Sequence, residues 1–311
     1  MNEFQLIENL TKDLPAGEDV IVGPGDDCAV LDVKGPLQLL LKTDAVVEGA
    51  HFERETDARL VGRKALSRCL SDVAAMGGSP AHAMVTLGLP DGFDPGYLHG
   101  VYAGLREVAD KYGVSIVGGE TTNNGDRLLI NIAVTGKVPI GKAVLRSGAK
   151  VGDAIFVSGE LGGSLEGHHL EFEPRLKESA WLTERFDVHS MIDLSDGLAG
   201  DLRHLARASK VGAELLESAI PISRAAKVRA RDRITDKPPL LAALTDGEDF
   251  ELLFTVSATD AVALLDGWKS EFPDVPLSCI GKIVDGDRLR IKDRSGIREL
   301  TVEGFTHFAK N

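Results

Sequence analysis

The chain has 311 residues, 43% of them apolar and 27% charged, which is typical of a soluble globular protein with more than one core. Its 48 acidic residues outnumber its 35 basic residues, and the net charge of -13 makes nucleic acid and anionic membranes poor partners. An anionic substrate would need metal cations between its own charges and the carboxylates of the protein.

The cysteines and the N-terminus indicate a reducing compartment. Cys28, Cys69 and Cys279 lie far apart and form neither a zinc pattern nor a disulfide framework. The N-terminal stretch "MNEFQLIENLTKDL" carries acids and lacks the apolar region of a signal peptide. No run approaches the roughly 18–20 apolar residues of a membrane span. We therefore expect a cytoplasmic protein that binds neither membrane nor nucleic acid.

Apolar runs and helical patterns alternate along the chain. Strands are predicted within residues 37–48, 113–122, 127–138, 153–159, 189–198 and 249–256. The first is expected to close on Thr43 and Asp44, and the second on Gly118, Gly119 and Glu120. Helical spacing predicts helices over residues 60–76, 95–111, 198–210 and 259–272. Because "VTLGL" and "LLINIAVTGKV" could also pair antiparallel, the fold class is mixed α/β.

A domain boundary is expected near residues 137–153. This segment, "KVPIGKAVLRSGAKVGD", is rich in Gly and Lys and has weak periodicity. The sequence therefore predicts an N-terminal domain over residues 1–138 and a C-terminal domain over residues 149–311.

Two acidic features raise the question of a bound cation. In "GPGDDCAV", Asp26 and Asp27 follow a turn signal, and they form either a solvated acidic turn or a cation-binding loop. Asp72 falls in the last turn of the helix predicted over 60–76, where the helix dipole disfavours an acid by about 0.3–1 kcal/mol. A nearby cation would offset that cost.

Other acids lie at or close to the ends of predicted buried strands, namely Asp44, Glu120, Asp193 and Asp196. In α/β proteins this is where ligands gather, and converging carboxylates repel one another unless divalent cations lie among them. Mg2+ prefers such oxygen ligands and shares them with substrate phosphates. This favours a metal-binding loop for Asp26 and Asp27.

Three further signals stay open on residue patterns alone. The segment "SGELGGS", residues 158–164, is either a phosphate cradle or a plain turn. Arg146 is either a phosphate contact or a solvated arginine, and His51 is either a substrate contact or a half-buried histidine.

Eight motifs, taken together and in order, resemble the thiamine-monophosphate kinases of the AIR-synthetase-like ATP-binding superfamily. They are "GPGDDCAVL", "KTDAVVEGAHF", "KALSRCLSDVAAMGGSP", "VGGETT", "RSGAKVGD", "IDLSDGLAGDL", "DGEDFELLF" and "GFTHF". The resemblance implies transfer of the γ-phosphoryl group of ATP to thiamine monophosphate. It also implies a two-domain protomer whose N-terminal domain pairs with a second copy into a β-barrel, so that the protein is a homodimer.

The resemblance also implies roles for individual residues. Several Mg2+ ions would be held by Asp27, Thr43, Asp44, Asp72, Glu120, Asp193 and Asp196, with Asp26 beside them. ATP would contact Gly119, Glu120, Arg146 and Ser195, and thiamine monophosphate would contact His51, Glu248 and Phe305. Direct in-line transfer needs no general base, because the acceptor is an ionised phosphate oxygen, and none is assigned.

Two residues depart from the family pattern. Glu120 stands where the family usually has Asp, and Lys42 stands where the family tends to place a small hydroxyl residue. Two other functions stay open. One is another ATP-using enzyme of the superfamily, such as a selenophosphate synthetase, and the other is a non-catalytic nucleotide-binding or metal-binding homologue, which the two departures would support.

Overall fold

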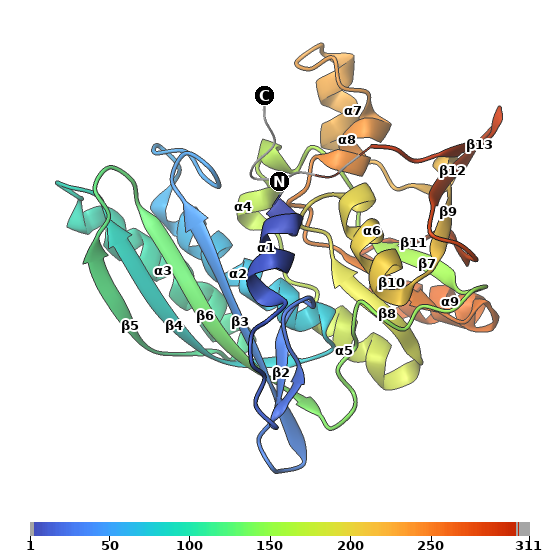
Figure 1. Cartoon of the computed structure of the whole chain (residues 1–311). Coiled ribbons are helices and arrows are strands. Elements are labelled where there is room, and N and C mark those ends of the chain that lie inside the picture. Colours follow the sequence, from blue (N-terminus) through green and yellow to red (C-terminus); the bar gives the residue numbers. More distant parts are fainter. Residues whose placement is uncertain (1–2, 303, 305–311) are drawn as a thin grey trace.

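Two mixed β-sheets follow one another along the chain in the computed structural model, which describes residues 3–302 and residue 304 (Figure 1). The six-stranded sheet has the order β1-β2-β3-β6-β4-β5 and consists of β1 (Val20–Val22), β2 (Ala29–Asp32), β3 (Leu37–Val47), β4 (Ser79–Leu89), β5 (Ser115–Asn123) and β6 (Leu129–Pro139). The seven-stranded sheet has the order β13-β12-β9-β11-β7-β10-β8 and consists of β7 (Ala154–Ser158), β8 (Val188–Asp193), β9 (Gly212–Leu216), β10 (Leu252–Val256), β11 (Leu277–Val284), β12 (Leu289–Asp293) and β13 (Gly296–Glu299).

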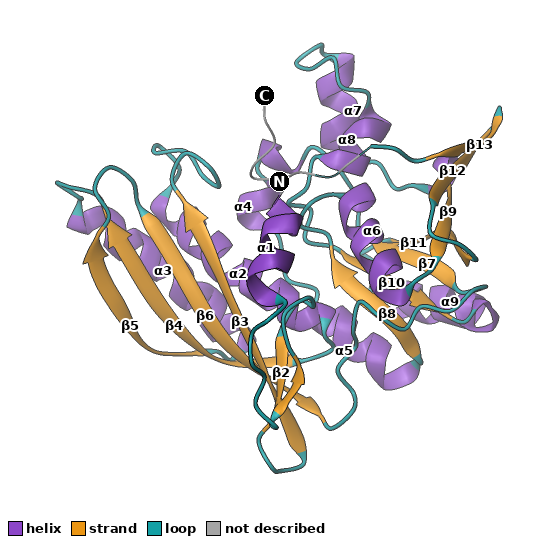
Figure 2. Ribbon diagram, viewed as in Figure 1, coloured by secondary structure: helices purple, strands orange, loops and turns teal. Residues whose placement is uncertain are grey.

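The helices lie between and around these sheets (Figure 2). They are α1 (Glu3–Thr11), α2 (Ala58–Ala75), α3 (Pro95–Tyr112), α4 (His168–Glu171), α5 (Leu176–Arg185), α6 (Leu198–Ser209), α7 (Arg224–Arg231), α8 (Pro239–Thr245) and α9 (Ala261–Glu271).

Helices α2 and α3 pack on one face of the six-stranded sheet, and within the described residues the other face has no such helical layer (Figure 1). Side chains alternate between the two faces of a strand. On β3, the buried Leu40 and Val46 share the inner face with Lys42 and Asp44, whereas Thr43 is on the outer face. The outer face carries exposed apolar side chains, among them Leu41, Met84 and Val117.

The seven-stranded sheet is covered on both faces. Leu198, Leu202 and Leu205 of α6 form a core with one face of the sheet. Trp181 of α5 and Trp268 of α9 form a core with the other face. The apolar runs of the central strands β7 and β10 are continuous because these strands are fully buried, whereas the edge strand β13 is exposed.

Helix α2 joins the two halves of the molecule. Asp57 caps its N-terminus, and its buried face includes Val61, Leu66 and Leu70. Its C-terminal part contacts β8 and α5, where Ser179 Oγ donates a hydrogen bond to the Ala74 carbonyl oxygen at 2.5 Å. The last turn of α2 therefore lies at the junction between the two sheets.

The predicted mixed α/β class is confirmed, and the four predicted helices correspond to α2, α3, α6 and α9 with ends that differ by no more than two residues. Two predicted strand ends are wrong. The strand expected to close on Thr43 and Asp44 continues to Val47, because β3 pairs with β6 along its whole length. Glu120 likewise lies within β5, which pairs with β4 as far as Asn123.

The predicted boundary segment joins the sheets. No helix or strand lies between Pro139 and Ala154. Among the residues that the structure describes, no helix is long and apolar enough to cross a membrane.

Candidate metal and nucleotide site

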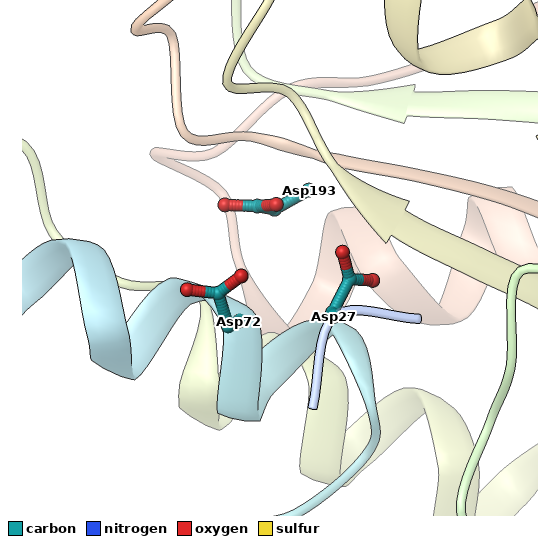
Figure 3. Close-up of side chains that lie close together, drawn as sticks. All are labelled: Asp27, Asp72 and Asp193. Carbon is teal, nitrogen blue, oxygen red and sulfur yellow. The ribbon is translucent and has the colours of Figure 1, made fainter. Parts of the chain in front are cut away.

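Three buried aspartates from three separate elements converge at the junction of the sheets (Figure 3). Asp27 lies in the turn before β2, Asp72 in the last turn of α2, and Asp193 at the end of β8. One carboxylate oxygen from each lies within 4.8 Å of the others. The sequence placed all three in one metal-binding group, and the fold brings them together from positions 166 residues apart at the extremes.

Asp27 is held by the connection between the sheets. Arg146 Nε donates to Asp27 Oδ1 at 3.1 Å, and Arg146 Nη2 contacts the same oxygen. The other oxygen, Oδ2, is buried and has no hydrogen-bond partner in the described part of the chain. Asp26 accepts hydrogen bonds from the Arg146 backbone N–H at 3.2 Å and lies outside the group of three.

The other two aspartates have partial partners. Lys42 Nζ donates to Asp72 Oδ1 at 2.6 Å, and Ser71 Oγ donates to Asp193 Oδ2 at 2.6 Å. The ammonium of Lys42 therefore supplies the cation that the last turn of α2 needs beside Asp72.

Burial makes it costly to ionise these carboxylates together. It raises the pKa of Asp193 to about 6, and the nearby Asp27 carboxylate adds to that shift. Burial also raises the pKa of Asp72, although the Lys42 ammonium opposes the shift. A divalent cation would remove this cost. The three carboxylates are oxygen donors of the kind that Mg2+ prefers, and the unpartnered Asp27 Oδ2 leaves a ligand position open. The residues present therefore fit a magnesium ion.

The remaining predicted metal ligands lie outside the group of three, although the Asp44 carboxylate is close enough to Asp72 to contribute to the raised pKa of that residue. Asp44 shares the inner face of β3 and forms an ion pair with Arg68 Nε at 3.1 Å. Thr43 is exposed on the outer face and donates to Asn131 Oδ1 at 3.0 Å. Glu120 is exposed, pairs in register with Thr86 of β4, and accepts a hydrogen bond from the N–H of Thr121 at 2.8 Å. These predicted ligands therefore lie on opposite faces of the six-stranded sheet, with Asp44 on the inner face and Thr43 and Glu120 on the outer face.

Two hydrogen bonds hold the loop after β8 in place, one to Asp201 and one from Glu248. Asp196 donates its backbone N–H to Asp201 Oδ2 at 3.0 Å, and the Ser195 carbonyl oxygen accepts the Glu248 N–H at 2.7 Å. Glu248 and Phe250 both adopt positive φ angles, 55° and 51°, which non-glycine residues rarely do. Backbone strain of this kind tends to be retained at functional sites.

His51 and Glu248, both predicted to contact substrate, both accept hydrogen bonds from one buried lysine, Lys64. Lys64 Nζ donates to the His51 carbonyl oxygen at 2.6 Å and to Glu248 Oε2 at 2.7 Å. The Lys64 side chain is fully buried. Phe305, the third predicted substrate contact, lies outside the described residues.

The two glycine-rich segments have structural explanations. The N–H groups of Gly162 and Gly163 donate to Asp249 and Asp246 at 2.9 Å each, so the loop over residues 158–164 is a tied turn rather than a phosphate cradle. A Cβ atom on Gly119 would lie 1.8 Å from the Val85 carbonyl oxygen, so glycine is required for the pairing of β5 with β4. The predicted contact of Gly119 with ATP stays a prediction.

Sequence reasoning overlooked four charged residues of this region: Lys64, Arg68, Asp201 and, as a counter-ion, Lys42. A signal was present for Lys64, because it falls on the apolar face of α2 between Val61 and Ala65. Buried charges on such a face need partners. Its partner Glu248 comes from a distant loop, which the local pattern does not indicate.

Comparisons with known proteins agree with this geometry. Family models described as AIR synthase related protein, N-terminal domain and C-terminal domain, match residues 25–138 and 156–294. The thiamine-monophosphate kinase of Rhodopirellula baltica is 39% identical over 96% of this chain and 93% of its own length. That of Bacillus subtilis is 31% identical over 99% of this chain and 100% of its own length.

The chain belongs to the thiamine-monophosphate kinase family. A solved structure of AaThiL complexed with AMPPCP and TMP has a TM-score of 0.84 and 30% identity, and the match covers 99% of this chain and 97% of that chain. Both sheets of this thiamine-monophosphate kinase family member therefore have the AIR-synthase-related fold.

Proposed function

We propose that this protein phosphorylates thiamine monophosphate to thiamine diphosphate with ATP as the phosphoryl donor. The observation that carries the proposal is the buried group of Asp27, Asp72 and Asp193 in a chain whose relatives over nearly full length are thiamine-monophosphate kinases. The relative complexed with AMPPCP and TMP supports the pairing of an ATP-like donor with a phosphate acceptor.

The aspartates would hold Mg2+ at the junction of the sheets. When bound, Mg2+ neutralises charge on both phosphate groups and on the leaving β-phosphate. The chain positions the carboxylates through Arg146 at Asp27, Lys42 at Asp72 and Ser71 at Asp193.

The acceptor is a phosphate oxygen that is already ionised near neutral pH, so no residue is required to remove a proton. We infer direct in-line transfer. Inversion of configuration at a chirally labelled γ-phosphorus would support it, and retention would contradict it.

The other predicted contacts extend the site toward its two substrates. Arg146 and the loop of Ser195 and Asp196 lie beside the acidic group, which supports nucleotide contacts there. Glu248 and His51 lie around Lys64, eight residues before Asp72 on α2, and the carboxylate of Glu248 would attract the cationic thiazolium ring.

The two sheets would form the cores of an N-terminal and a C-terminal domain, and the N-terminal sheet would pair with a second copy. The support is the uncovered outer face with its exposed Leu41, Met84 and Val117. Thr43 and Glu120 lie on this side of the sheet, so in such a homodimer they would approach the partner rather than the three aspartates.

The decisive experiment is a coupled assay of thiamine diphosphate formation from ATP and thiamine monophosphate at saturating Mg2+. Selenide and formylglycinamidine ribonucleotide serve as acceptor controls for other enzymes of the superfamily. Nucleotide binding without product from any acceptor would instead identify a non-catalytic homologue.

A further inference from the structure

Lys42 occupies an unusual position for a lysine. It lies on the inner face of β3, between the buried Leu40 and the half-buried Asp44, and points toward the last turn of α2. Its ammonium is 2.6 Å from Asp72 Oδ1, and the two side chains are only 24% and 9% exposed. Because both side chains are largely buried, this ion pair belongs to the interior of the site and not to the surface.

Lys42 interacts with more than one carboxylate. Besides Asp72, the carboxylates of Asp44 and Asp27 lie close enough to stabilise its charge. Asp44 is additionally paired with Arg68, whose side chain is also largely buried. The Asp44 and Asp72 side of the acidic group is therefore supplied with two cations from the chain itself.

The opposite side of the group differs. Asp27 is paired with Arg146 through Oδ1 alone and its Oδ2 has no partner in the described residues, while Asp193 accepts a hydrogen bond from the neutral hydroxyl of Ser71. The need for an added cation is therefore concentrated on the Asp27 and Asp193 side.

We propose that the ammonium of Lys42 takes the place of one divalent cation, so that this chain binds one metal ion fewer than it would with a small residue at position 42. The inference rests on the proposed function, since it concerns the ions of that same site. An ammonium contributes one positive charge and three hydrogen-bond donors, but it cannot coordinate a carboxylate and a phosphate oxygen as an octahedral metal does. A metal is thus required at Asp27 and Asp193, whereas the position between Asp44 and Asp72 is already filled.

The test counts Mn2+ ions bound per full-length chain by electron paramagnetic resonance, with saturating AMPPCP and with nucleotide-bound Mn2+ subtracted. Lys42→Ser vacates the position and should bind one more Mn2+ per chain than the unaltered protein. Lys42→Arg keeps a cation there and should leave the count unchanged. Lys137→Ser, an exposed lysine on the neighbouring strand β6, removes the same charge elsewhere and should also leave it unchanged.

Lys42→Gln guards against misfolding, because it preserves most of the side-chain volume and can still donate to Asp72; it too should gain one ion. Asp72→Asn introduced into Lys42→Ser should abolish the gain. An equal count in the unaltered protein and in a folded Lys42→Ser or Lys42→Gln variant would overturn the proposal, as would a gain in Lys42→Arg. The count requires no thiamine monophosphate, so failure of the kinase assay and failure of this inference are separate results.

Discussion

The carboxylate of Glu251 and those of Asp27, Asp72 and Asp193 are similarly buried, yet they are paired to different degrees. Arg175 contacts both oxygens of Glu251, with Nε 2.7 Å from Oε2 and Nη2 2.5 Å from Oε1, and Ser158 Oγ donates to Oε2 at 2.6 Å. In the group of three, Asp27 Oδ2 has no partner in the described part of the chain.

The difference separates a structural ion pair from a binding site. A buried carboxylate that is fully paired needs nothing further, and its partners fix one local structure. A buried oxygen without a partner costs free energy until a ligand reaches it. Burial alone would rank the two groups equally, whereas incomplete pairing favours a metal ion only at the group of three.

The largest effect is expected when the cation is removed from the fully paired carboxylate of Glu251. Arg175→Met leaves the buried carboxylate of Glu251 without its cation and should lower the free energy of unfolding by about 3–5 kcal/mol. Urea denaturation measures it. Lys177→Met, an exposed neighbour on α5, should change it by less than about 0.5 kcal/mol. A loss in Arg175→Met as small as that in the control would show that Glu251 does not depend on Arg175.

The opposite result is expected for the incompletely paired group. Asp193→Asn keeps an oxygen that can accept the Ser71 hydrogen bond, so the fold should be retained. Turnover should fall by more than about 100-fold, since even residues that only orient a metal ligand contribute about 10- to 100-fold. Steady-state rates at saturating Mg2+ and the melting temperature measure the two effects. Near-normal turnover would remove Asp193 from the metal site, and the exposed Asp266→Asn serves as the control.

Lys64 extends the comparison to a buried cation with one carboxylate partner. Burial lowers the pKa of Lys64 from 10.5 to about 8, although Glu248 opposes the shift. Between those two pH values the unfolded chain binds more protons than the folded chain, so the contribution of Lys64 to stability rises with pH. The free energy of unfolding should therefore rise by about 2–3 kcal/mol relative to Lys64→Met between pH 8 and pH 10.5. Parallel stability curves for the two proteins over this range would contradict the assignment.

The smallest effect is expected at an exposed carboxylate. Glu120→Asp should change the Mg2+ concentration at half-maximal activity by no more than about twofold, because exposed substitutions usually alter free energies by within 0.5 kcal/mol. Activity measured against Mg2+ concentration decides the point. A larger increase would place Glu120 in the metal shell, as the family resemblance implies, and would indicate that the second copy of a homodimer completes the site.

Local patterns were sufficient for much of the fold. The 3.6-residue spacing of α2 and the Gly77 turn after it identified this helix and placed Asp72 in its last turn. The strand ends were less predictable, because β3 continues past Asp44 only through its pairing with β6, a partner more than eighty residues away. A polar residue inside a strand looks like a strand end until its partner is known.

The residues of the candidate site were likewise predictable only in part. The motifs identified the three aspartates, since each stands in a recognisable local context. The counter-ions Lys42, Lys64 and Arg68 were not identified, because a lysine or arginine in the sequence looks like a surface residue until the fold buries it beside an acid. The two-sided placement of Thr43 and Asp44 follows from strand alternation, but only once the strand is known to run through both.

The ion pair between Arg146 and Asp27 bears on the order in which the site forms during synthesis of the chain. Translation delivers all strands of the six-stranded sheet by Pro139, but Arg146 and then Asp193 emerge later. Domains generally fold from the N-terminus as they are made. A nascent chain at that stage would carry Asp27 and Asp72 without the arginine that orients one of them and without the third carboxylate. The proposed metal site of three aspartates would thus be complete only after β8 has docked.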